Sequence, residues 1–262
     1  MENSLGISVS FIGAGHVANH LASSFYTKGV IVQQIYNRSH KSGRDLSRLV
    51  SAQYISSLKD LKPSDYLIIA VNDNAVKTIA DAIPKTLIKN TIIVHTSGSQ
   101  SIEVLQKHRY YGGFYPLQSF RKALPIDIRT VPILISSKEE IVKKRLIQLG
   151  ETISTKVTAI SDADRSLIHL PAVMVNNFTN HLLQLAYDYC EKRNLDFTLL
   201  HPLINETVRR LENQKPPKEM QTGPAIRGDQ NTINRHLTQL GDFSEIKQLY
   251  QFMSHHIEEY YE

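Results

Sequence analysis

A glycine-rich turn near the start of the chain constrains the fold more than any other feature. Gly13-x-Gly15-x-x-Ala18 follows the apolar segment 7–12 and precedes a helical pattern that ends near Gly29. Gly13 permits a tight turn, Gly15 lets the backbone approach a ligand, and Ala18 allows the helix to pack closely on the strand. The N–H groups that open such a helix attract phosphates. The pattern predicts a strand–helix unit that binds a dinucleotide.

Apolar strand patterns alternate with helical patterns over the first 160 residues. The expected strands are 7–12, 30–36, 53–55, 66–71, 91–95, 112–115, 131–135 and 156–160. Several are apolar throughout rather than at every second residue, which is typical of a parallel sheet covered on both faces. A second strand follows the glycine turn at the expected distance, which disfavours a plain strand–helix turn. We predict an α/β fold class, with a Rossmann-like, doubly wound, mostly parallel sheet over residues 1–160.

Helical patterns dominate the rest of the chain. They cover 163–193, 198–213, 232–240 and 244–259, with a loop rich in proline and lysine at 214–222. The long uncharged stretch 166–187 contains histidine, asparagine and glutamine and is too polar for a membrane span. We expect an all-helical domain over residues 161–262 that serves substrate binding and dimerisation, and no membrane partner.

The charge of the chain is divided unevenly. The whole chain has 262 residues and a net charge of +5, yet residues 1–157 carry 20 Lys and Arg against 11 Asp and Glu, and the remainder carries 10 against 14. A basic protein can bind nucleic acid. A basic half that binds a polyphosphate cofactor is the competing interpretation, and the uneven division favours it. We expect no nucleic-acid partner.

Cysteine is rare in this sequence. Cys190 is the single cysteine, which excludes an intrachain disulfide and any multi-cysteine metal site. The histidines and carboxylates show no convincing metal-ligand spacing, so we predict no metal. Residues 1–6 lack the basic and apolar segments of a signal peptide. We expect a cytoplasmic protein, because a lone thiol suits a reducing compartment.

The residues after the second expected strand discriminate between cofactors. An NAD site usually has a carboxylate there for the adenosine ribose, whereas this chain has Asn37, Arg38 and Ser39. A guanidinium and a hydroxyl suit a 2′-phosphate, so the sequence favours NADP (NADPH) over NAD. The alternative is that Arg38 is a solvated surface residue.

Two further loops follow expected strands at the sheet edge where open α/β folds bind ligands. One begins after the strand 66–71, and the other runs from His95 to Gly98 and is expected to approach the nicotinamide. Asp73 has an alternative role as a helix cap. The predicted cofactor residues are Gly13, Ala14, Gly15, His16, Val17, Asn37, Arg38, Ser39, Val71, Asn72, Asp73 and Ser97.

The combined motifs resemble a known family. Segments 11–18, 37–39 and 70–73 resemble the cofactor domain of the pyrroline-5-carboxylate reductase and beta-hydroxyacid dehydrogenase superfamily. Segments 95–98, 115–118, 169–177 and 223–229 are similar to a bacterial family of predicted oxidoreductases that pair a Rossmann-like domain with a C-terminal domain of unknown function. The resemblance implies an NADP-binding oxidoreductase. It also implies a helical domain like the C-terminal domain of 6-phosphogluconate dehydrogenase, and a homodimer formed through it.

The related dehydrogenases carry a catalytic lysine on an early helix of the second domain, and the matching stretch 164–178 has no lysine. His169, Asn176 and Asn180 have helical spacing, so they would share a face and line a substrate cleft, or alternatively bond to one another. His169 is the first candidate for the proton transfer that accompanies hydride transfer. Further candidate catalytic residues are His95, Asn176 and Arg227, the last as a clamp for a substrate carboxylate.

These observations lead to one main hypothesis and two alternatives. The main hypothesis is an enzyme that uses NADP as cofactor to transfer hydride to or from a C=O or C=N group of a small, carboxylate-bearing metabolite. The first alternative is a nucleotide-binding sensor without turnover, because the catalytic lysine is missing. The second is nucleic-acid binding through the basic half.

Overall fold

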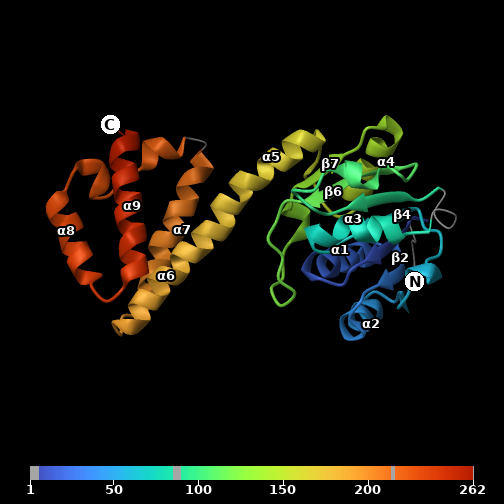
Figure 1. The fold of residues 1–262 in the computed structure, drawn as a ribbon, viewed down its shortest axis with the longest axis horizontal. Coiled ribbons are helices and arrows are strands. Elements are labelled where there is room, and N and C mark those ends of the chain that lie inside the picture. The colour runs from blue at the N-terminus through green and yellow to red at the C-terminus, as the bar shows by residue number, and fades with distance from the viewer. Residues whose placement is uncertain (1–5, 85–89, 214–215, 262) are drawn as a thin grey trace. The chain divides into compact units, whose positions relative to one another are not determined.

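Eight strands form one sheet in the computed structural model, which describes residues 6–84, 90–213 and 216–261 (Figure 1). The strands are β1 (Ser8–Ile12), β2 (Ile31–Tyr36), β3 (Gln53–Ile55), β4 (Tyr66–Ile69), β5 (Ile92–His95), β6 (Tyr111–Pro116), β7 (Ile133–Ser136) and β8 (Val157–Ala159). Their order in the sheet is β3-β2-β1-β4-β5-β6-β7-β8. The chain therefore winds one way from β1 to β3 and the other way from β4, and the predicted doubly wound α/β class is confirmed.

The sheet is parallel except where β6 meets β7. These two strands are antiparallel, with Gly113 opposite Ser136, and β8 runs parallel to β7. An antiparallel pair needs no crossover helix between its strands. The connecting segment 117–132 therefore starts and ends at the same edge of the sheet, the edge formed by the carboxyl ends of β1, β4, β5 and β6.

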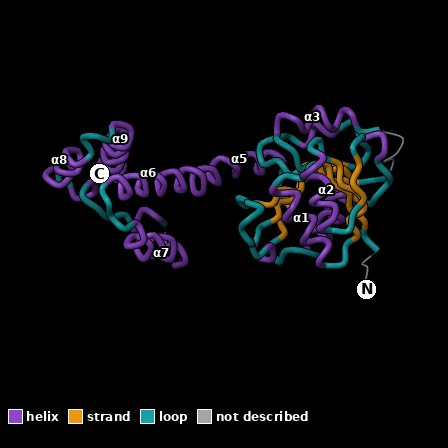
Figure 2. Tube along the Cα trace, turned by 90° about the horizontal axis from the view of Figure 1, so that it is seen from below, coloured by secondary structure: helices purple, strands orange, loops and turns teal. Residues whose placement is uncertain are grey.

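Helices cover both faces of the sheet (Figure 2). The helices of this part of the chain are α1 (His16–Thr27), α2 (His40–Leu49), α3 (Asp73–Ala82), α4 (Glu140–Glu151) and α5 (Asp162–Val173). Apolar residues of α1, α2 and α4 form one buried cluster with the strands, and those of α3 form a second cluster on the other face. Burial on both faces explains why the strands are apolar throughout.

The chain divides into two units, residues 1–176 and 177–262. The expected domain boundary was residue 160, and the difference arises from α5. The Arg165 side chain on this helix is fully buried against the loop that follows β5, so the helix belongs with the sheet. The second unit is helical, with α6 (Thr179–Lys192), α7 (His201–Arg209), α8 (Gln230–Gln239) and α9 (Ser244–Tyr261).

One long helix was expected over residues 163–193, and the structure interrupts it. A π-helical turn, Met174–Phe178, separates α5 from α6. Pro171 lies inside α5 and has no N–H to donate, so the hydrogen-bond ladder is already broken one turn before the wide turn. A π-turn adds a residue to the helix and rotates everything beyond it. Asn176 and Asn180 therefore lose the simple α-helical relation to His169 that the spacing predicted.

Candidate functional site

The glycine-rich turn has two glycines with different environments. Gly13 has a φ of +113°, and a Cβ there would overlap the backbone carbonyl of Ala70 at the end of β4. Gly15 has an ordinary φ of −74°, and a Cβ there would meet no atom within 4 Å. Gly13 is therefore required for the fold. Gly15 leaves open space in front of the first N–H groups of α1, which are the groups that bind phosphates.

The loop after β2 is fastened to this turn. The Asn37 Oδ1 atom accepts a hydrogen bond of 3.1 Å from the Ala14 amide, and the Asn37 Nδ2 atom donates one of 2.9 Å to the Ser39 carbonyl. Arg38 is exposed between them, and within the described part of the chain its guanidinium has no hydrogen bond or ion pair. A free guanidinium beside the opening of α1 provides a second group for an anion.

A cavity of about 500 Å³ joins these elements. Most of the predicted cofactor residues line it, namely Gly13, Ala14, Gly15, His16, Val17, Asn37, Arg38, Val71 and Asn72. Residues that the sequence reasoning missed also line it, namely Tyr36, Ala70, Ala75, Ile79, Thr96 and Phe120. The cavity thus follows the carboxyl edge of the sheet from β2 past β1 and β4 to the loops after β5 and β6. An elongated cavity with a phosphate-binding helix end fits a dinucleotide.

Ser39, Asp73 and Ser97 were predicted to contact the cofactor but do not line this cavity. Ser39 precedes α2, and its side chain forms no cap hydrogen bond. Asp73 is the first residue of α3 and does not cap it, because its carboxylate accepts a 2.5 Å hydrogen bond from the Ser99 hydroxyl instead. The Ser97 hydroxyl accepts hydrogen bonds from the amides of Ser99 and Gln100. Asp73 and Ser97 therefore shape the loop after β5 and join it to α3.

His95 ends β5 and is completely buried. Its Nδ1 atom accepts a hydrogen bond from the Ser97 amide, so the neutral ring carries its proton on Nε2. Burial, and next the nearby positive charge of Arg165, lower the pKa of His95 from 6.5 to about 4. The ring is therefore neutral at pH 7, which does not suit a proton donor at neutral pH.

The Arg165 side chain also holds the loop that follows β5. Its guanidinium donates to the carbonyl oxygens of Ser97 and Gln100 and, over 2.6 Å, to the Asp162 carboxylate. Asp162 in turn accepts from the Ser101 hydroxyl and the Ile102 amide. The pKa of Asp162 is lowered, because these hydrogen bonds and the positive charge of Arg165 outweigh the effect of burial. Arg165 lies in the stretch that lacks a lysine, and it is a structural clamp rather than an exposed cation.

His169 lies one helical turn after Arg165 and is half-buried. Its Nδ1 atom is 3.2 Å from the hydroxyl of Tyr115 on β6. Both side chains press on Gly98, where a Cβ would lie 2.6 Å from the Nδ1 atom of His169 and 2.8 Å from Cζ of Tyr115. Tyr115 was absent from the predicted site residues. Its position at the carboxyl end of a strand was the available signal.

The remaining candidate residues lie elsewhere. Asn176 is exposed within the π-helical turn. Arg227 belongs to the second unit and is exposed in a short 3-10 helix, Ala225–Arg227, that ends at Gly228 with a φ of +62°. Asp229 accepts a hydrogen bond from the Thr232 amide and caps α8.

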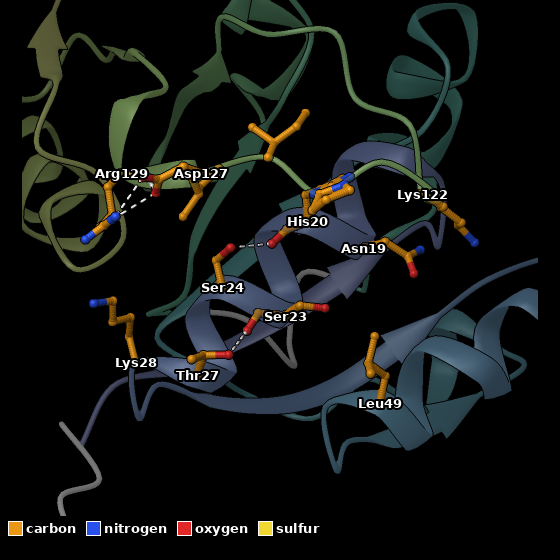
Figure 3. Close-up of a pocket in the computed structure, with 13 residues that line it drawn as sticks. Asn19, His20, Ser23, Ser24, Thr27, Lys28, Leu49, Lys122, Asp127 and Arg129 are labelled. Carbon is orange, nitrogen blue, oxygen red and sulfur yellow. Dashed lines mark hydrogen bonds and ion pairs between the residues drawn. The ribbon is translucent and has the colours of Figure 1, made fainter.

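A second cavity, of about 510 Å³, lies between α1 and the segment 122–129 (Figure 3). The hydroxyls of Ser24 and Thr27 donate back to carbonyls of their own helix, and Arg129 is paired with Asp127. No residue of the glycine-rich turn lines this cavity. The phosphate-binding features therefore belong to the first cavity.

Metal-binding clusters and membrane-spanning helices are both absent from the described residues. No group of three or more histidine, cysteine, aspartate or glutamate side chains is placed to hold a metal ion among residues 6–84, 90–213 and 216–261. Within those same ranges, every helix is too short or too polar to cross a bilayer.

Two family models match the chain. Residues 3–118 match the model of a Rossmann-like domain, and residues 131–257 match the domain of unknown function DUF2520. A crystal structure from Bacteroides fragilis, described as a "putative NADP oxidoreductase", is 35% identical. The alignment covers 97% of this chain and 98% of that one, with a TM-score of 0.91.

More distant structures share the fold. An imine reductase from Myxococcus stipitatus in complex with NADP+ is 13% identical over 96% of this chain and 93% of that one, with a TM-score of 0.68. A reductive aminase from Aspergillus terreus in complex with NADPH and ethyl levulinate is 14% identical over 94% and 92%, with a TM-score of 0.70. The chain has no match among curated protein sequences.

Proposed function

The chain belongs to the family that joins a Rossmann-like domain to a DUF2520 domain, and from this premise we propose that it is an NADP-dependent oxidoreductase. The cavity along the carboxyl edge of the sheet is the observation that carries the proposal. It combines the open space at Gly15 with the unpaired guanidinium of Arg38. The relative that is 35% identical bears the name of the same class of protein.

The residues present fit the proposed cofactor. The open space at Gly15 and the N-terminus of α1 would receive the pyrophosphate, and Arg38 would bind the 2′-phosphate. Val71, Ala75 and Ile79 would contact the apolar parts of the adenosine half. When bound, the nicotinamide would exchange a hydride with a carbon of the substrate. The chain supplies the phosphate contacts, the orientation and the proton.

We further propose the substrate class expected from the sequence, a C=O or C=N group in a small metabolite that bears a carboxylate. Distant proteins with this fold include an imine reductase and a reductive aminase, so C=N bonds belong among the compounds tested. Arg227 is our candidate for the carboxylate contact, and His169 is our candidate for proton transfer. The buried thiol of Cys190 is free, which suits a cytoplasmic protein.

The decisive experiment combines binding with turnover. NADPH fluorescence would give the dissociation constant, and loss of NADPH absorbance would report reduction of 2-oxo acids, levulinate, 1-pyrroline-2-carboxylate, and cyclohexanone with and without ammonia. We expect binding and NADPH oxidation with at least one compound. Binding without oxidation across the panel would favour the sensor alternative. Salt-dependent binding of DNA or RNA that NADPH does not displace would favour the nucleic-acid alternative.

We also propose that two copies associate through the helical unit. Several large apolar residues on or beside α7 and α9 are strongly exposed, namely Leu199 (75%), Leu203 (63%), Val208 (60%) and Phe252 (66%). We infer that they contribute to one apolar patch, and such a patch typically marks a protein interface. Light scattering should report twice the chain mass, and Leu203→Lys should lower that mass, whereas the exposed substitution Leu124→Lys in the first unit should not. A monomeric wild-type protein would contradict the proposal.

A further inference from the structure

Tyr115 and His169 form a hydrogen-bonded pair at the carboxyl edge of the sheet. The 3.2 Å contact between the hydroxyl and Nδ1 is accompanied by an edge-to-face arrangement of the rings, with centroids 6.1 Å apart. Both side chains are half-buried. The pair is therefore ordered by packing, yet it remains accessible from the solvent side.

The geometry of two elements brings this pair together. Arg165 and His169 are four residues apart on α5, a rise of about 6 Å along a helix. Gly113 and Tyr115 are two residues apart on β6, a rise of about 6.6 Å along a strand. Arg165 packs over Gly113, where a Cβ would lie 3.3 Å from its Nε atom, and His169 meets Tyr115 at the next step. The buried Arg165 side chain thus fixes how α5 lies along β6, and this position brings the His169 imidazole against the Tyr115 phenol.

Gly98 holds the pair against the loop after β5. A Cβ at this position would lie 2.6 Å from His169 Nδ1 and 3.0 Å from the Tyr115 hydroxyl oxygen. Thr96, two residues earlier, lines the elongated cavity. Neither Tyr115 nor His169 lines that cavity, but at Gly98 the pair contacts the loop whose Thr96 does, at the β5 end, whereas Arg38 lies at the β2 end. If Arg38 binds the adenosine phosphate, the nicotinamide end of the cofactor points toward Tyr115 and His169.

We propose that the Tyr115 hydroxyl gives the proton that accompanies hydride transfer and that His169, through Nδ1, returns a proton to Tyr115. This inference rests on the proposed function. In the direction of reduction, hydride addition to the substrate carbon moves the π-electron pair onto oxygen or nitrogen. The Tyr115 O–H bond breaks as the new O–H or N–H bond forms. The Nδ1–H bond of the His169 imidazolium then breaks to restore the phenol, and the neutral imidazole regains a proton from water.

Other groups nearby are less suited to this step. His95 is buried and neutral at pH 7, and Arg165 has its guanidinium committed to the loop and to Asp162. The charged groups that face the pair from neighbouring elements are Arg165 on α5 and Asp73 on α3, which have opposite effects on the phenol, while burial raises the pKa of Tyr115. A phenol that stays protonated until charge develops on the substrate suits a donor coupled to an imidazolium.

The first arm of the test needs no substrate. Histidine labelled with ¹⁵N would be observed by NMR in the wild type, in Tyr115→Phe and in the control Tyr26→Phe, which removes the hydroxyl that hydrogen-bonds with Ser51. We expect the Nδ1 signal of His169 to move in Tyr115→Phe and to remain in place in Tyr26→Phe. An unmoved signal in Tyr115→Phe would show that the two side chains are not hydrogen-bonded, whatever the protein catalyses.

The second arm uses whichever compound of the panel is reduced. Tyr115→Phe should lower kcat by about 10²- to 10⁴-fold, the range of general acid catalysis, with the NADPH dissociation constant within about twofold of the wild type. His169→Gln should also lower kcat, with the NADPH dissociation constant again within about twofold of the wild type, because the phenol then has no imidazole to return its proton. Gly98→Ala should resemble Tyr115→Phe, because it separates the pair while keeping the hydroxyl.

The outcomes separate the two proposals. Full kcat in Tyr115→Phe would show that His169 or water donates directly, which overturns the relay. A parallel loss of kcat and NADPH affinity would assign Tyr115 a structural role, which also overturns it. NADPH that binds without turnover of any compound would defeat the proposed function, and the NMR arm would then decide on the pair by itself.

Discussion

Gly13 and Ala70 approach so closely that only a glycine fits between the ends of β1 and β4. A Cβ on Gly13 would overlap the Ala70 carbonyl oxygen, and the φ of +113° already disfavours any other residue. Gly13→Ala should therefore cost about 3 kcal/mol or more in the free energy of unfolding of the sheet unit. Urea denaturation followed by circular dichroism would measure it. A variant within 0.5 kcal/mol of the wild type, roughly the effect of a neutral surface change, would refute the assignment.

Gly15 offers the matched experiment. A Cβ there meets no atom within 4 Å, so Gly15→Ala should change the free energy of unfolding by no more than about 0.5 kcal/mol. The added methyl would occupy the space proposed for the pyrophosphate, and NADPH affinity should fall by about tenfold or more. Calorimetric titration with NADPH would show this. Wild-type affinity in Gly15→Ala would mean that the cofactor does not approach the turn.

The hydrogen bonds of the Arg165 side chain predict an order of stability for the wild type and two variants. Arg165→Met removes the cation beside the Asp162 carboxylate and the side-chain donor of two loop carbonyls, which should destabilise the sheet unit by about 3–5 kcal/mol. Arg165→Lys keeps the charge but cannot span the same acceptors, so it should lie between Met and the wild type. Urea denaturation of the three proteins gives the order. Equal stability of Arg165→Met and the wild type would contradict the clamp.

His95 predicts a pH dependence of stability. Its pKa is about 4 in the folded protein and 6.5 in an unfolded chain, so the unfolded chain binds a proton first as the pH falls. This difference in pKa contributes on the order of 3 kcal/mol to the free energy of unfolding. The contribution is fully present above pH 6.5 and is lost as the pH falls from 6.5 to 4. Denaturation at several pH values should show a shallower slope for His95→Gln than for the wild type. Identical slopes would contradict a buried, neutral His95.

The sequence was sufficient for most of the sheet, because long apolar strands and a glycine turn leave few alternatives. The antiparallel direction of β7 was not predictable in this way. Ile133–Ser136 is buried on both faces, so its composition resembles that of a parallel strand. Pro171 indicated an interruption in the backbone hydrogen bonds of α5. Residue spacing alone could not indicate whether the helix would kink, end or widen into a π-turn.

The candidate site likewise contains residues that the sequence predicted and residues that it did not. Gly15, Asn37 and Arg38 were predictable because they belong to a local strand–turn–helix pattern of known geometry. The contact between Tyr115 and His169 joins residues 54 positions apart and depends on how α5 lies over β6. Phe120 lines the cavity because its segment follows β6 at the carboxyl edge and, with β7 antiparallel, ends at that same edge. Tertiary register, rather than local pattern, determines both.

The most direct test of NADP use is a calorimetric titration of the wild type and of Arg38→Ala with NADPH and with NADH. We expect the wild type to prefer NADPH and Arg38→Ala to lose about 10- to 100-fold in NADPH affinity, the equivalent of one charge-assisted contact of about 1.5–3 kcal/mol, with NADH affinity nearly unchanged. Lys41→Ala, on the exposed start of α2, serves as the control. Equal affinity of the wild type for the two nucleotides, or NADPH affinity unaffected by Arg38→Ala, would contradict the assignment of this cavity to NADP.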